Sequence, residues 1–152
     1  MEITIPVVIL DQVSKGLARA SLVPGEVHEL LPFANLRLGF NWGISFGFLP
    51  AEESSGVFLL IGVTALISIG MAIWSVMAQT WQESTALTLI LGGALGNLID
   101  RVRDGMVTDF IDLHVAGYHW PTFNGADIAI TLGAIWLVAD GLVTHFRRRE
   151  LI

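Results

Sequence analysis

The chain contains no cysteine and little charge, since only 14% of its 152 residues are Asp, Glu, Lys or Arg. Without cysteine it can form no disulfide, thiolate nucleophile or thiolate zinc site. Soluble domains carry about 25% charged residues, so the composition excludes an ordinary soluble domain. A net charge of −6 provides no basic surface for nucleic acid. With 53% hydrophobic residues, the remaining class is a small integral membrane protein, a single domain over residues 1–152.

Apolar runs predict the membrane-spanning helices. The clearest run covers residues 57–78 and has no charged side chain. As a helix it would extend about 33 Å, which is enough to cross a bilayer. The first run is the least regular, because Asp11, Lys15 and Arg19 interrupt it. The sequence predicts four transmembrane helices, over about 3–22, 57–78, 82–104 and 125–146.

Basic residues indicate the orientation of these helices. Arg147, Arg148 and Arg149 follow the last helix, and such clusters favour the cytoplasmic side. Four helices then place both termini in the cytoplasm, and residues 23–56 and 102–125 on the outer side.

A regular alternation in the first outer loop predicts a strand. Apolar residues occupy every second position from Leu36 to Phe48, with polar residues or glycine between them, which is typical of a half-buried strand. We therefore expect a small extracytoplasmic β-sheet, over about 30–50, between the first two helices of an otherwise all-α membrane protein. The alternative is a helix with glycine on one face, at Gly39, Gly43 and Gly47.

Charged residues inside membrane helices require a reason, because they are costly there. Asp11, Lys15 and Arg19 are spaced by four residues and would share one helix face. They could form a structural ion pair or part of a site. In the third helix, Asn97 and Asp100 share another face, and we interpret Asp100 with its neighbour Arg101 as an architectural pair.

Three carboxylates are candidates for catalysis: Asp109, Asp112 and Asp127. Asp109 and Asp127 both fall just outside the apolar runs on the same expected side. Two converging carboxylates can share one proton, so that one acts as a base and the other as an acid. Such a pair can activate water against a peptide bond without a metal. Both carboxylates also have a purely structural interpretation. Asp109 could be a solvated acid in a loop, and Asp127 could be an acid in the first turn of a helix that Asn124 caps.

Five segments resemble the lipoprotein signal peptidase (signal peptidase II) family. They are Asp11-Gln12-Val13-Ser14-Lys15, Asn41-Trp42-Gly43-Ile44-Ser45-Phe46, Gly92-Gly93-Ala94-Leu95-Gly96-Asn97-Leu98-Ile99-Asp100-Arg101, Val107-Thr108-Asp109-Phe110 and Phe123-Asn124-Gly125-Ala126-Asp127. The resemblance implies an aspartyl endopeptidase of the bacterial cytoplasmic (inner) membrane that cuts prolipoproteins before a diacylglyceryl-modified cysteine. It implies globomycin as inhibitor, lipid and lipid-modified prolipoproteins as partners, and no cofactor or metal.

The same resemblance implies the site residues. Asp109 and Asp127 would be the catalytic dyad. Residues that would shape and support the site are Asp11, Lys15, Asn41, Gly43, Asn97, Asp100, Arg101 and Asn124. The site can be completed within one chain, so we expect a monomer.

Three features depart from the family pattern. Ile44 and Ser45 stand where small alanines are usual, which affects the expected width of the substrate groove. Gly125 replaces an aliphatic residue and loosens the helix start. Only ten residues precede Asp11, where the family has a full span with a basic tip. A start assigned too late, or a shortened sequence, would account for this third difference.

Other function classes stay open at this point. A small four-helix transporter would also carry intramembrane acids, but its binding charges should gather near the midplane. A non-enzymatic membrane scaffold needs no dyad at all. A metal hydrolase could use Asp109, Asp112, His114 and His119, but their spacing matches no motif such as H-E-x-x-H. A Ser–Lys protease is disfavoured, because the adjacent Ser14 and Lys15 would point apart on a helix.

Overall fold

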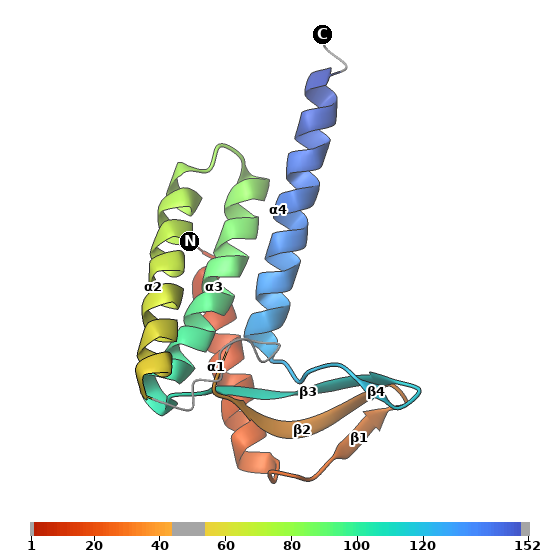
Figure 1. Cartoon of the computed structure of the whole chain (residues 1–152). Coiled ribbons are helices and arrows are strands. Elements are labelled where there is room, and N and C mark those ends of the chain that lie inside the picture. Colours follow the sequence, from red (N-terminus) through yellow and green to blue (C-terminus); the bar gives the residue numbers. More distant parts are fainter. Residues whose placement is uncertain (1, 44–53, 150–152) are drawn as a thin grey trace.

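The structure is a computed structural model that describes residues 2–43 and 54–149. Its helices and strands are α1 (Thr4–Ser21), β1 (His28–Leu31), β2 (Ala34–Asn41), α2 (Ser54–Met77), α3 (Trp81–Asp104), β3 (Val107–Val115), β4 (Tyr118–His119) and α4 (Gly125–Arg149). The helices stand side by side, and the sheet lies across one end of the bundle (Figure 1). The α2–α3 turn and the end of α4 lie at the opposite end (Figure 1).

Three described helices are long and apolar enough to cross a membrane, over Gly56–Met77, Trp81–Asp104 and Gly125–Thr144. The expected fourth span, α1, is not among them, because charged residues interrupt its 18 residues. α3 is the central helix: 56% of its apolar window is buried, against 11% in α2 and 17% in α4. The chain is thus mostly helical, and its other helices gather around α3.

Glycine allows close packing against α3. A Cβ atom at Gly92 would lie 2.7 Å from Cβ of Val7 in α1. On the side of α4, a Cβ atom at Gly133 would lie 2.6 Å from the carbonyl oxygen of Ala86. Small residues let helix backbones approach closely in membranes, where dispersion contacts drive association. These glycines therefore set the spacing of α1, α3 and α4.

The sheet is antiparallel, with the strand order β1-β2-β3-β4. Its central pair aligns Gly39 with Asp109 and Asn41 with Val107. The expectation of a sheet confined to the segment between the first two helices is wrong, because β3 and β4 follow α3. The reason is backbone pairing: β2 requires hydrogen-bonding partners on a neighbouring strand, and the segment after α3 supplies them.

The alternating segment forms a strand only in part. β2 covers Ala34–Asn41, so the helical alternative is wrong for these residues. Trp42 and Gly43 lie outside the strand. The expectation for Ile44–Phe48 concerns residues outside the described ranges, as does the effect of Ile44 and Ser45 on a groove.

The glycine packing predicts the effect of a single methyl group. Gly133→Ala should lower the stability of the protein by about 1–3 kcal/mol, because the new Cβ overlaps α3. Gly141→Ala is the matched control on the same helix, since nothing lies within 4 Å of its Cβ position. The control should be neutral or stabilising, because alanine favours helices. Thermal unfolding in one detergent measures both, and equal midpoints would contradict this packing role.

Candidate active site

Asp127 lies in the first turn of α4, where Asn124 precedes the helix. The side-chain oxygen of Asn124 accepts from the backbone N–H of Asp127 at 3.1 Å. In return, Oδ2 of Asp127 accepts from the backbone N–H of Asn124, also at 3.1 Å. This reciprocal pair is a capping box. It fixes the carboxylate of Asp127 at the positive end of the α4 dipole.

Asp109 lies on β3 and is only 3% exposed. Its Oδ1 accepts from Nδ2 of Asn124 at 2.6 Å. Its Oδ2 accepts from Nδ2 of Asn41, on the neighbouring strand β2, at 3.3 Å. One residue, Asn124, therefore binds both candidate carboxylates, Asp127 through its backbone and Asp109 through its side chain.

The surroundings of Asp109 favour its protonated form. Burial, and then the nearby charge of Asp127, raise the pKa of Asp109 to about 7. The hydrogen bonds from Asn124 and Asn41 oppose this rise, because they favour the ionised form. A carboxyl group with a pKa near neutrality can donate or accept a proton under physiological conditions.

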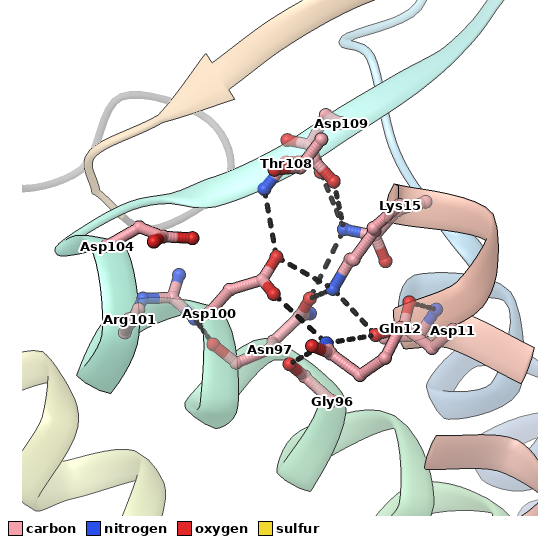
Figure 2. A network of polar contacts seen from close by, with 12 residues as sticks. Asp11, Gln12, Lys15, Gly96, Asn97, Asp100, Arg101, Asp104, Thr108 and Asp109 are labelled. Atoms are coloured by element: carbon pink, nitrogen blue, oxygen red, sulfur yellow. Dashed lines mark hydrogen bonds and ion pairs between the residues drawn. The ribbon is translucent and has the colours of Figure 1, made fainter. Parts of the chain in front are cut away.

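A buried cluster of charges lies beneath Asp109 in the view of Figure 2. Its centre is Lys15, which is 1% exposed. The Lys15 ammonium contacts Oδ2 of Asp11 at 2.8 Å and Oδ2 of Asp100 at 3.2 Å. It also donates to Oδ1 of Asn97 at 2.9 Å. An ammonium has three protons and no acceptor, so these three partners satisfy it completely.

Asp100 connects this cluster to the sheet. Its Oδ2 accepts from the backbone N–H of Thr108 at 3.1 Å, one residue before Asp109. Its other oxygen accepts from Nε2 of Gln12, on α1, at 3.0 Å. The carboxylate also pairs with Arg19 and Arg103. The predicted Asp100–Arg101 pairing needs correction, since the ion pairs of Asp100 are with Lys15, Arg19 and Arg103.

Asp11 binds the start of α4. Its Oδ1 accepts from the backbone N–H of Ala126 at 2.9 Å, while its other oxygen pairs with Lys15. A carboxylate at a helix N-terminus satisfies an amide that has no partner within the helix. The same side chain therefore fixes the ammonium and the helix that carries Asp127.

Donor-only partners determine how the two site amides are oriented. Because the Lys15 ammonium can only donate, the carbonyl oxygen of Asn97 faces it. The amide nitrogen of Asn97 then faces Asp127 and donates to Oδ1 at 2.9 Å. The backbone N–H of Asp127 fixes the oxygen of Asn124 in the same way, which turns its nitrogen toward Asp109. Both amides thus direct their N–H groups at the carboxylates.

Arg101 connects α3 to the segment after β2. Its guanidinium donates to the carbonyl oxygen of Gly43 at 3.0 Å. The backbone N–H of Gly43 donates to Oδ1 of Asn41 at 3.0 Å, so the amide nitrogen of Asn41 is left for Asp109. Arg101 also lies within electrostatic range of Asp109 and Asp127. All ten predicted site residues are therefore connected to the two carboxylates or to the cluster beneath them.

Sequence reasoning missed several residues of this network. Gln12 bridges Asp11, Asp100 and the carbonyl oxygen of Gly96, and Thr108 accepts from Arg19. Gln12 and Thr108 each lie inside one of the five segments that resemble the family. That position was the only feature of the sequence that could have indicated a role in the site. Apart from Asp11, these partners lie 84 to 89 residues away, which no local pattern reveals.

Asp112, the third candidate carboxylate, has other partners than Asp109 and Asp127. It is 2% exposed, and its carboxylate accepts from Nδ2 of Asn35 at 3.2 Å and contacts Nδ1 of His119 at 2.8 Å. The His114 ring stacks on the His119 ring. Within the described ranges, no three His, Cys, Asp or Glu side chains converge as possible metal ligands.

Comparison with known proteins identifies the family of the chain. The family model described as signal peptidase (SPase) II matches residues 3–143. The chain belongs to the signal peptidase II family. A lipoprotein signal peptidase of Polynucleobacter necessarius is 45% identical over 152 residues, covering 96% of this chain and 90% of the relative. One of Coxiella burnetii is 41% identical over 142 residues, covering 91% and 86%.

Solved structures agree as well. A bacterial membrane enzyme determined by the in meso method at 2.3 Å resolution superposes with a TM-score of 0.82 at 33% identity, covering 92% of this chain and 85% of that one. A second, at 1.9 Å, gives 0.80 at 33% identity, covering 92% and 90%. This member of the signal peptidase II family is therefore a peptidase and a multi-pass membrane protein.

The buried cluster predicts a strong dependence of folding on Lys15. Lys15→Met should destabilise the protein by about 3–5 kcal/mol, because two buried carboxylates lose their shared cation. Arg103→Met is the matched control, since Arg103 contacts the same Asp100 but its side chain is 50% exposed. It should cost at most about 1 kcal/mol. Thermal unfolding in detergent measures both, and similar losses would contradict a central role for Lys15.

Proposed function

We propose that this chain is an aspartyl endopeptidase that removes the signal peptide from diacylglyceryl-modified prolipoproteins, cutting immediately before the lipidated cysteine. The observation that carries the proposal is the joint fixation of Asp109 and Asp127 by Asn124. Two carboxylates held by one residue, one on a helix start and the other buried on a strand, are suited to opposite protonation states.

In the proposed reaction, Asp127 is the base and Asp109 the acid. The helix N-terminus and the donor Asn97 favour a negative charge on Asp127, whereas burial favours a proton on Asp109. Asp127 removes a proton from water as the oxygen attacks the scissile carbonyl carbon, and Asp109 donates its proton to the carbonyl oxygen. When the tetrahedral intermediate collapses, Asp127 returns its proton to the leaving nitrogen and Asp109 recovers its own.

The supporting residues act through the two carboxylates. Lys15 orients Asn97, and Asp11 holds the start of α4. Asp100 fixes β3 through the amide of Thr108. Arg101, through Gly43, keeps Asn41 directed at Asp109. These roles leave the reacting groups with little freedom, and such preorganisation lowers the cost of reaching the transition state.

We place the protein in the cytoplasmic membrane with α1 as a fourth span. Residues along α1 support this placement, because Ile5, Ile9 and Leu17 are 67%, 56% and 63% exposed and would face lipid. Both termini lie in the cytoplasm, and the dyad lies at the outer face beside the sheet. The protein acts as a monomer on lipid-modified substrates, requires no cofactor, and is inhibited by globomycin.

The alternatives are a small membrane transporter and a non-enzymatic scaffold. Incubating the purified protein with a lipidated prolipoprotein distinguishes them, since only a peptidase releases the signal peptide on a gel. Cleavage that resists chelators and is blocked by globomycin would exclude a metal hydrolase.

Variants of the dyad test the assignment. Asp109→Asn, Asp127→Asn and the double variant should all lose cleavage to a similar extent, because the two carboxylates act as a unit. Each should still insert into the membrane and bind substrate. Asp112→Asn, which lies outside the dyad, should retain measurable cleavage. The assignment is wrong if Asp112→Asn abolishes cleavage while either dyad variant stays near normal.

The pKa of Asp109 predicts the pH dependence. Because the acid must hold its proton, kcat/KM should fall as pH rises through about 7. Asn41→Ala removes a hydrogen bond that favours the ionised form, so the alkaline limb should move to higher pH. The same variant should fold and turn over more slowly, because Asp109 is less well positioned. An unshifted limb in the Asn41→Ala profile would count against Asn41 acting on Asp109.

A further inference from the structure

A cleft of about 450 Å³ lies on the sheet beside the dyad. Its walls include Arg37 and Gly39 of β2, Asp112 of β3, and the segment around His119 and Thr122 that leads into α4. Neither Asp109 nor Asp127 lines it, so the cleft is separate from the reacting groups.

The cleft and the dyad nevertheless share the same strands. Gly39 is the direct pairing partner of Asp109, and Asp112 follows Asp109 by three residues on β3. Three residues of extended chain span about 10 Å. A substrate whose scissile bond lies at Asp109 therefore reaches the cleft with about its third residue beyond that bond.

The cleft presents a positive charge that the rest of the site does not use. Arg37 is exposed and forms no ion pair with any residue of the described ranges, whereas Lys15, Arg19 and Arg103 all pair with carboxylates. The carboxylate of Asp112 forms no ion pair with Arg37; it is 2% exposed and contacts Asn35 and His119 instead. The available group in the cleft is thus a guanidinium.

His119 adds a second recognition element. Its Nδ1 contacts the Asp112 carboxylate at 2.8 and 2.9 Å. Its Nε2 forms no hydrogen bond within the described ranges. The cleft therefore offers a guanidinium to a carboxylate and a ring nitrogen to a main-chain group, the two kinds of group that an acidic residue in an extended peptide supplies.

We propose that this cleft binds the part of the substrate that follows the cleavage point, and that Arg37 recognises an acidic side chain there. The inference rests on the proposed function. A peptide is favoured over a lipid phosphate, because the substrate chain must leave the dyad away from the helices, and the sheet covers that end of the bundle (Figure 1).

Synthetic lipopeptides test the proposal. They carry the diacylglyceryl cysteine and are identical except for Asp, Asn or Lys at the third residue beyond the scissile bond, with further sets at the second and fourth. The native protein should show a kcat/KM about two- to fivefold higher for Asp than for Asn, the range of a partly exposed ion pair. Arg37→Gln should bring this ratio to about one, and Arg37→Glu should favour Lys. His119→Ala should lower kcat/KM for all three peptides alike.

Two exposed residues of β1 that do not line the cleft provide controls. Glu29→Gln and His28→Ala should keep the native ratio of Asp to Asn. The proposal is wrong if the native ratio is near one at all three positions, or if Arg37→Gln retains the preference. The assay is repeated with the protein in lipid vesicles of different anionic lipid content. The proposal is also wrong if the effect of Arg37→Gln on kcat/KM depends on that lipid content rather than on the substrate residue, since the cleft would then bind lipid headgroups. If the native protein cleaves none of the peptides, the proposed function itself fails, and the inference with it.

Discussion

The rest of the site depends on one buried ammonium. Lys15 is satisfied by Asp11, Asp100 and Asn97, which come from two helices. A buried cation without partners would be very costly, and two buried carboxylates without it equally so. The helices α1 and α3 are therefore held in one relative position. Because Asp11 also binds the start of α4, and Asp100 the start of β3, the same constraint positions both segments that carry the dyad.

A second constraint is that Asn97 and Asn124 each face a group that can only donate a hydrogen bond. Lysine and backbone amides can only donate, so each Asn side chain turns its oxygen toward a donor and its nitrogen toward a carboxylate. The result is a pair of carboxylates that receive hydrogen bonds in fixed directions. Their environments still differ, since Asp127 lies at a helix start and Asp109 is buried on a strand. This difference supports the proposed division into base and acid.

Several features could be predicted from local sequence. The apolar runs and low charge gave a mostly helical membrane chain, and the alternation after Leu36 gave a strand, because both patterns reflect how side chains face lipid or core within a few residues. The second half of the sheet was missed. The residues of β3 are buried in a pattern without strict alternation, since Thr108 and Asp109 both face polar partners. The pairing of Asp100 was also misassigned, because two of its three cations, Lys15 and Arg19, come from another helix.

The sequence by itself determined the class of protein, the family and the residue types of the site, because composition and short motifs carry that information directly. The ion pair of Asp11 with Lys15 follows from their spacing of four residues, but only the tertiary structure decided the cations of Asp100 and how the amides are turned. It also decided that a cleft with a single unpaired guanidinium lies beside the dyad. The physical reason is distance along the chain: the contacts that join α1 to α3 and to the start of α4 connect residues more than eighty positions apart, and such contacts follow from packing rather than from any local pattern.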